Sequence, residues 1–125
     1  MKHIRLYDFA GHEITQFAQW DKNVYVTIEG AALEEAPVVY FHANGIHSYK
    51  SNGTVLENGI ACIVPPEVLT QTNPITVTLG YFRGVDEFVT PYYTVVPVMR
   101  RPKLSEEGFH APEYIEGDDL SYGGN

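Results

Sequence analysis

The chain has 125 residues, 44% of them hydrophobic, and a formal net charge of −8. No apolar run approaches the roughly 20 residues that a transmembrane helix needs, so we expect no membrane-spanning helix. The acidic balance disfavours nucleic acid as a partner, because phosphate binding needs basic patches, and it disfavours an anionic membrane surface for the same reason. The length predicts one domain, with a short tail.

The charge is spread unevenly along the chain. Residues 1–100 contain six basic and ten acidic residues, whereas residues 101–125 contain two and six, so the last fifth holds half of the net charge. Cys62 is the only cysteine, which excludes an internal disulfide and fits assembly in the cytosol. Because Cys62 lies in an apolar run, we predict a buried hydrophobe and no reactive thiol.

The first segment of the chain predicts two strands, over residues 3–9 and 13–18. Both ranges are rich in β-branched and aromatic residues. Residues 10–12 make a tight connection that contains glycine, so the two strands are predicted to pair as a hairpin.

The clearest strand pattern covers residues 23–30. Val24, Val26 and Ile28 alternate with more polar residues, which is the period of a half-buried strand. Trp20, the only tryptophan, precedes this strand. We expect Trp20 to cover one end of the core.

Short strands continue through the middle of the chain. Residues 37–43 are predicted to form a hairpin with residues 46–50 around Asn44-Gly45, a pair of residues that tolerates positive φ. Two further strands are predicted over residues 54–56 and 60–64. Turn residues separate all of these segments.

The last predicted strands are longer. Residues 66–71 begin with proline and predict one helical turn that plugs the edge of the fold. Residues 75–82 alternate strictly between apolar and polar positions. Residues 87–99 predict a strand or strand pair bent at Pro91, and Pro97 requires an edge position or a bulge.

Eight to ten short strands with regular turn signals predict an all-β fold. The expected architecture is an antiparallel, immunoglobulin-like β-sandwich over residues 1–100, and a small barrel is the alternative. Residues 101–125 contain prolines and glycines without periodicity. They predict an extended or disordered acidic tail.

The sequence predicts no enzyme and no cofactor. The histidines and Cys62 lack zinc-motif spacing, although His42 and His47 could face each other across a hairpin. The chain has no Gly-x-Ser-x-Gly motif and no glycine-rich phosphate loop. Paired carboxylates fall in predicted loops or in the tail, where charged pairs are usually solvated.

Aromatic residues are the abundant feature. A row of them on a sheet face could bind sugar or protein, although most are expected to pack the core or to pair across strands. The candidates are Tyr40, Tyr49, Tyr81, Phe82, Phe88, Tyr92 and Tyr93. In the acidic tail, Phe109, Tyr114 and Tyr122 are candidate anchors for docking on a partner, and Arg100 and Arg101 precede them.

Several segments together resemble small tail or baseplate structural proteins from phages and prophages of Gram-positive bacteria. The similarity covers about residues 4–103, and the order of the pieces carries it. The segments are Leu6-Tyr-Asp-Phe9, Phe17-Ala-Gln-Trp-Asp-Lys-Asn23, Val39-Tyr-Phe-His42, Ile63-Val-Pro-Pro-Glu-Val-Leu69 and Val96-Pro-Val-Met-Arg-Arg-Pro-Lys103.

The resemblance implies an immunoglobulin-like domain and a non-enzymatic virion component. It further implies other phage tail proteins as partners, a homo-oligomer within the assembly, and a location in the virion tail. The alternative function is a carbohydrate-binding module that recognises a bacterial surface glycan through exposed aromatic residues.

Overall fold

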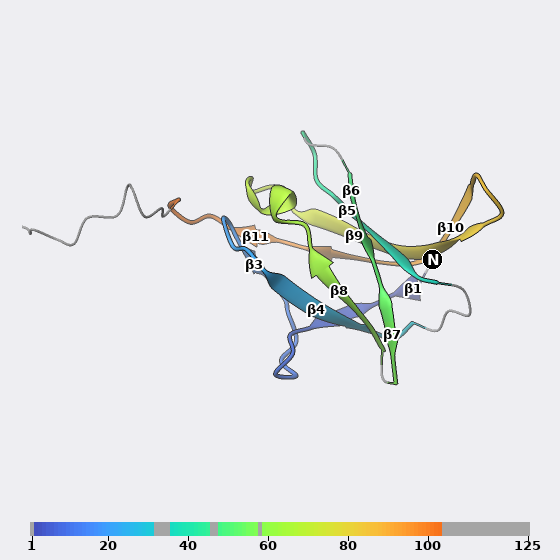
Figure 1. Cartoon of the computed structure of the whole chain (residues 1–125). Helices are drawn as coiled ribbons and strands as arrows, with labels where there is room; N and C mark the ends of the chain where they lie inside the picture. The colour runs from blue at the N-terminus through green and yellow to red at the C-terminus, as the bar shows by residue number, and fades with distance from the viewer. Residues whose placement is uncertain (1, 32–35, 46–47, 58, 104–125) are drawn as a thin grey trace, which may run out of the picture.

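The computed structural model describes residues 2–31, 36–45, 48–57 and 59–103. Within these ranges the chain forms eleven β-strands and one short 3₁₀ helix. In chain order they are β1 (Lys2–His3), β2 (Arg5–Tyr7), β3 (Phe17–Ala18), β4 (Val24–Glu29), β5 (Val38–His42), β6 (Tyr49–Asn52), β7 (Thr54–Leu56), β8 (Gly59–Val64), η1 (Pro66–Leu69), β9 (Ile75–Arg83), β10 (Glu87–Val96) and β11 (Val98–Met99). The predicted all-β class is confirmed (Figure 1).

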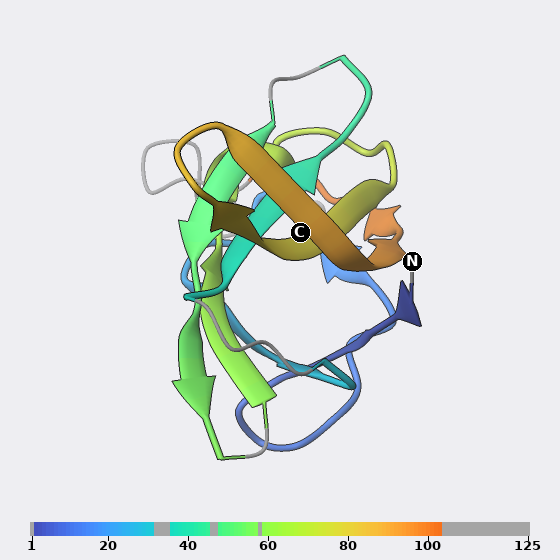
Figure 2. The same ribbon diagram turned by 90° about the vertical axis from the view of Figure 1, so that its right-hand side faces the viewer.

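Two sheets pack face to face as a sandwich. The first sheet has the strand order β1-β10-β9-β5-β6, and the second has the order β2-β4-β8-β7. Figure 2 shows β5, β9 and β10 above β2 and β4. The short strands β3 and β11 form a separate pair at one end. This arrangement is consistent with the predicted immunoglobulin-like sandwich.

The core is built from residues that alternate along the strands. Val26 and Ile28 of β4 are fully buried, whereas Tyr25 beside them is exposed, as the sequence period predicts. Other fully buried side chains are Ile4, Leu6, Val39, Phe41, Val64, Val68, Leu69, Ile75, Val77 and Leu79. Both sheets therefore contribute to one core.

The helical turn predicted over residues 66–71 is the 3₁₀ helix η1. Its buried residues Val68 and Leu69 close one end of the sandwich, and this is the role that the sequence predicted for the turn. The helix has four residues. None of the helices within the described ranges has the length and apolar character needed to cross a membrane.

The pairing of β5 with β6 was predicted correctly, but β6 covers Tyr49–Asn52, whereas the prediction was residues 46–50. The two strands pair with Phe41 opposite Tyr49, and Gly45 in their connection has a φ of 86°, which glycine adopts without strain. Residues 46–47 lie outside the described residues. After Gly53 the chain continues into β7, so residues 49–56 form an edge of both sheets (Figure 1).

The hairpin predicted from residues 3–9 and 13–18 forms only in part. An antiparallel bridge joins Tyr7 to Glu13, and backbone hydrogen bonds run from Ile14 to Leu6 and from Asp8 to His12. The pairing does not continue to residues 17–18, which form β3 and pair with β11, while β2 also pairs with β4 in the second sheet. That second pairing places Leu6 fully inside the sandwich, and apolar burial of this kind is not visible in a local turn signal.

Two strand pairings are parallel, so the sandwich is not purely antiparallel. β1 pairs in parallel with β10, and β3 pairs in parallel with β11. Both pairings join the beginning of the chain to its last strands. A parallel pair needs a long connection, and local sequence signals do not specify its partner.

β10 carries a bulge at Pro91, where the sequence predicted a bend, whereas Pro97 lies between β10 and β11. The register of β10 with β9 shifts between Val89 and Tyr92, around Pro91. Gly80 of β9 is buried under this bulge. A Cβ at Gly80 would overlap the carbonyl oxygen of Val89, so only glycine fits there.

Trp20 lies at the end of the sandwich that η1 closes, as expected. However, the indole is half-buried at the surface and is not part of the core. The backbone at Trp20 has a φ of 74°, and its N–H donates a 2.7 Å hydrogen bond to the carbonyl of Leu69. The corner after β3 is therefore tied to η1 through its backbone.

Candidate functional surfaces

The described chain ends beside Trp20, at the end of the sandwich opposite the N-terminus (Figure 1). Nη2 of Arg101 donates a 2.6 Å hydrogen bond to Oδ1 of Asp21, and the Arg101 N–H donates to the side-chain oxygen of Gln19 at 3.2 Å. Nζ of Lys103 lies 5.0 Å from the centre of the Trp20 ring, within cation–π range. These contacts attach the last described residues to the sandwich.

Two of the five residues predicted to dock on a partner lie in the described part of the chain. Arg100 is exposed, whereas Arg101 is half-buried and paired with Asp21. The Arg101 Nε is buried without a hydrogen-bond partner among the described residues. The remaining three, Phe109, Tyr114 and Tyr122, lie outside the described residues. The predicted division into a sandwich and a tail remains a prediction.

The outer face of the first sheet carries an aromatic cluster, which we define as Tyr40, Phe82 and Phe88. The Phe88 ring centroid lies 4.9 Å from that of Tyr40 and 4.9 Å from that of Phe82. Tyr40 faces outward because its neighbours Val39 and Phe41 fill the core. The rings thus support one another on the surface of the sheet.

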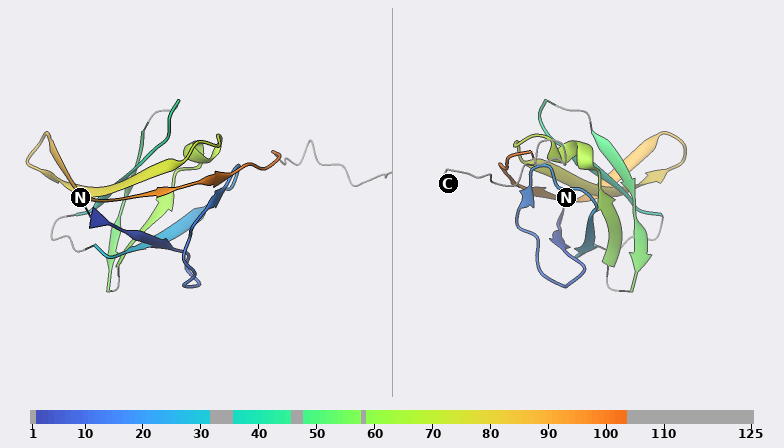
Figure 3. Two further views of the ribbon diagram at one scale, coloured as in Figure 1. Left: turned by 180° about the vertical axis from the view of Figure 1, so that it is seen from behind. Right: turned by 60° about the vertical axis from the view of Figure 1, so that its left-hand side comes forward.

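β9 and β10 form a hairpin that projects from the sandwich (Figure 3). Val85 at its tip is 93% exposed, and Phe82 of the aromatic cluster is 39% exposed. Arg83 and Glu87 flank the tip, with 3.6 Å between their charged groups. The hairpin therefore presents apolar side chains beside exposed charges.

The other aromatic candidates have different surroundings. Tyr49 and Tyr92 pack partly buried against the core, as most of the aromatic residues were expected to do. Tyr81 is half-buried. Tyr93 contacts His3 edge to face, with 5.3 Å between ring centroids. Among the aromatic residues predicted to form a binding row, Tyr40, Phe82 and Phe88 are the ones whose rings contact one another beside the exposed hairpin.

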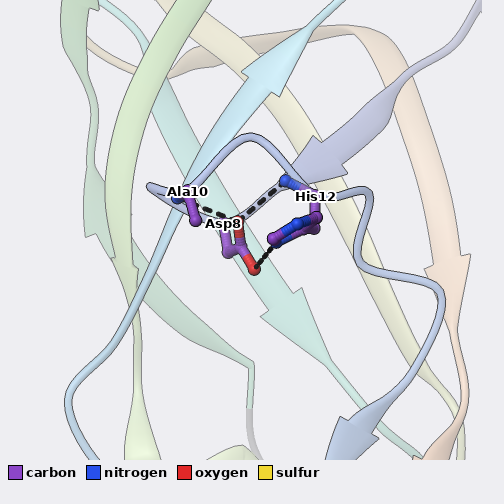
Figure 4. Close-up of polar contacts among 3 residues, drawn as sticks. All are labelled: Asp8, Ala10 and His12. Carbon is purple, nitrogen blue, oxygen red and sulfur yellow. Dashed lines mark hydrogen bonds and ion pairs between the residues drawn. The ribbon is translucent and has the colours of Figure 1, made fainter.

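On the second sheet, residues 8–12 form a tightly hydrogen-bonded loop. Oδ1 of Asp8 accepts hydrogen bonds of 2.9 Å from the N–H groups of Ala10 and His12 (Figure 4). Oδ2 of Asp8 lies 3.5 Å from Nδ1 of His12. The hydrogen bond from the His12 backbone is the main cause that lowers the pKa of Asp8, because it stabilises the carboxylate.

This loop presents Phe9, which sequence analysis placed at the end of a strand. Phe9 is 68% exposed, and its ring centroid lies 5.8 Å from that of Tyr25, an exposed residue of β4. The sequence signal that could have found the loop is Asp8 followed by Gly11. Aspartate side chains often bond their own backbone two residues on, and such turns favour glycine.

The groups that could carry chemistry have ordinary surroundings. His42 Nδ1 lies 2.9 Å from the Ser48 hydroxyl, and His47 is outside the described residues. Among the described residues no group of three His, Cys, Asp or Glu side chains is placed to hold a metal. Cys62 is buried as predicted, and desolvation raises its pKa to about 12.

Comparison with known proteins gives no match to a protein family, to a curated protein or to a solved structure. Function must therefore be inferred from the surfaces of this chain and from the resemblance of its sequence segments. Two surfaces have side chains suited to recognition. They are the aromatic cluster with its hairpin, and the face of the second sheet beside Phe9.

Proposed function

We propose that the protein is a non-enzymatic structural module of a phage or prophage tail baseplate. It attaches to neighbouring tail proteins, including copies of itself, within the virion tail. The resemblance of residues 4–103 to small baseplate proteins supports the class of assembly. The observation that carries attachment is the aromatic cluster beside the exposed Val85, because such apolar area is typical of a surface that a neighbour covers.

Burial of this surface provides the free energy of attachment. Full burial of a Val or Phe side chain contributes roughly 1.5–3 kcal/mol. Val85 can gain nearly all of that amount because it is 93% exposed, whereas Phe82 can gain only part. One such contact is weak, but repeated copies in an assembly act together and raise the overall affinity.

The charged residues around the hairpin tip fit the rim of an interface. Arg83 and Glu87 form an exposed ion pair, and Asp86 lies between them in sequence. Rim charges of this kind contribute little affinity, but they set the orientation of the partner and the salt dependence of binding. We therefore expect attachment to be apolar at its centre and moderately sensitive to salt.

Light scattering over a range of protein concentrations tests the attachment surface. The wild-type chain should show an average mass that rises with concentration, and the double variant Phe82→Ser/Val85→Asp should remain monomeric. Val55→Asp is the matched control, because Val55 is a 60% exposed valine on β7 of the second sheet. The surface is misassigned if the double variant associates as strongly as the wild type.

The phage assignment has a separate test. Particles induced from the host culture and purified by density should contain the chain together with tail proteins when analysed by mass spectrometry. The neighbouring genes should encode other tail components. The assignment is contradicted if purified particles lack the chain, or if the neighbouring genes include no tail genes. Neither result bears on the attachment surface, which the light-scattering experiment tests separately.

A further inference from the structure

We propose that the outer face of the second sheet binds a sugar ring that carries no acidic group. The site is a groove of about 480 Å³, a volume within the usual range for small-molecule sites. It is separate from the attachment surface proposed above, because the aromatic cluster belongs to the first sheet. The inference therefore does not depend on the tail-module function.

The groove runs across the sheet between its two edge strands. β4 and β8 form the middle of the sheet and contribute Thr27 and Gly59, while β2 and β7 lie at its edges. Tyr7 and Phe9 line the groove from the β2 side, and Leu56 lines it from β7. The groove is therefore shallow, with aromatic and aliphatic side chains along its sides, and this shape accommodates a flat, partly apolar sugar ring.

Phe9 is held ready for a ligand before binding. The Asp8 side chain fixes the loop through hydrogen bonds to the N–H groups of Ala10 and His12, and the Asp8 N–H donates to the His12 carbonyl at 2.9 Å. These bonds fix the backbone that presents Phe9, and the Phe9 ring contacts the Tyr25 ring, with 5.8 Å between centroids. Ordering Phe9 on binding therefore costs less entropy than ordering a residue of a mobile loop. Aromatic faces stack on the C–H face of a pyranose, which matches this geometry.

The charge of the groove selects against acidic ligands. Its carboxylates are Asp8, Glu29 and Glu57, and none of its described lining residues is basic. Arg5, on the same strand as Tyr7, is the nearby cation; it is not among the residues that line the groove, and its charge is matched by a hydrogen bond to Tyr7 and by Glu13. Carboxylates accept hydrogen bonds from sugar hydroxyl or ammonium groups, and they repel phosphate and uronic acid groups.

The floor does not suit an extended peptide. Thr27 of β4 pairs with Tyr7 on one side and with Ala61 on the other, so its strand has no free edge for an added strand. Recognition at the floor must use side chains rather than main-chain pairing. Hydroxyl, carboxylate and aromatic side chains are the groups that recognise a sugar.

Amide NMR titration of the full chain tests the site with three probes. A cello-oligosaccharide is neutral, a chitosan oligosaccharide carries amino groups, and an oligogalacturonate is acidic. We expect saturable shifts at Gly11, Thr27 and Gly59 with the neutral or the amino probe, and none with the acidic probe. Phe9→Ala should weaken binding between about twofold and twelvefold, the range for loss of one aromatic contact.

Two controls separate the site from the rest of the surface. Phe82→Ala changes an exposed phenylalanine on the first sheet and should leave sugar binding unchanged. Phe9→Ala should leave self-association unchanged. The proposal fails if none of the probes binds, if the acidic probe binds equally well, if the shifts lie outside the groove, or if a lysine-rich peptide occupies the groove and the sugars do not.

Discussion

Arg101 and Asp21 lie 80 residues apart in sequence and are joined by a 2.6 Å hydrogen bond between guanidinium and carboxylate. Asp21 belongs to the corner between β3 and β4, and Arg101 follows β11. The Arg101 N–H also bonds the side chain of Gln19 in the same corner. The exit of the chain is therefore tied to its first third by charge-assisted contacts, next to the parallel pairing of β3 and β11.

Arg101→Ala should lower the free energy of unfolding by about 0.5–1.5 kcal/mol, the range for a partly exposed charged hydrogen bond. Urea denaturation at low salt measures the change. Arg100→Ala is the matched control and should have no effect, because Arg100 is exposed. In a double-mutant cycle, Asp21→Ala should add little to Arg101→Ala. Full additivity would show that the two residues do not interact.

Truncation should separate the sandwich from the chain that follows it. A chain ending at Lys103 keeps the contacts of Arg101 and should retain the melting temperature of the full protein. A chain ending at Pro97 loses β11 and its pairing with β3, and should melt at a lower temperature. Circular dichroism measures both. If the chain ending at Lys103 is unfolded, residues 104–125 are part of the core and the predicted division is wrong.

Gly80→Ala should destabilise the protein by about 3 kcal/mol, because the new Cβ overlaps the backbone of the β10 bulge. Guanidinium denaturation measures the loss. Gly84→Asn is the control: this glycine has a φ of 73° and open space around it. Asparagine tolerates that conformation, so the control should cost no more than about 0.5 kcal/mol. A well-tolerated Gly80→Ala would contradict the close approach of the two strands.

The thiol of Cys62 should not react with a thiol reagent at pH 8 until urea unfolds the chain. Burial raises its pKa from 9.0 to about 12, so the unfolded thiol ionises first. The free energy of unfolding contributed by Cys62 is thus fully present below pH 9 and is lost as the pH rises toward 12. The stability difference between wild type and Cys62→Ala should shrink over this window. Rapid labelling of the native protein would show an accessible thiol.

The Asp8 loop should open in acid. Its hydrogen bonds lower the pKa of Asp8, so their stabilisation is present above the ordinary carboxyl pKa and is lost as pH falls through the lower folded value. Asp8→Ala should speed hydrogen exchange at the Ala10 and His12 amides at neutral pH. Asp8→Asn, which keeps an acceptor oxygen, should retain part of the protection. Equal exchange in all three proteins would show that the side chain does not order the loop.

Local sequence determined much of the fold. The alternation in β4 and β9 placed Val26, Ile28, Val77 and Leu79 in the core, and Pro91 marked the irregular point of β10. The turn over residues 66–71 was likewise predicted correctly, and so was the pairing of β5 with β6, although β6 covers Tyr49–Asn52 and the prediction was residues 46–50. These features depend on the backbone preferences of neighbouring residues and on a period of two, which are both visible in a short window.

The two candidate surfaces could be predicted from the sequence only in part. Tyr40, Phe82 and Phe88 were named among the aromatic candidates, but their contact depends on the pairing of β5, β9 and β10. Phe9 was placed in a strand because strand-forming residues precede it, although Asp8 followed by Gly11 is a local signal for the loop that begins after Tyr7. Exposure is decided by which strands cover a residue, and that is a property of the whole sheet.

The sequence by itself thus determined the all-β class, most strand positions and the inward-facing residues. Only the tertiary structure decided that β2 pairs with β4, that β1 and β3 pair in parallel with the last strands, and that Trp20 lies at the surface. The physical reason is that strand period is local, whereas partner choice is set by the free energy of burying distant apolar residues together.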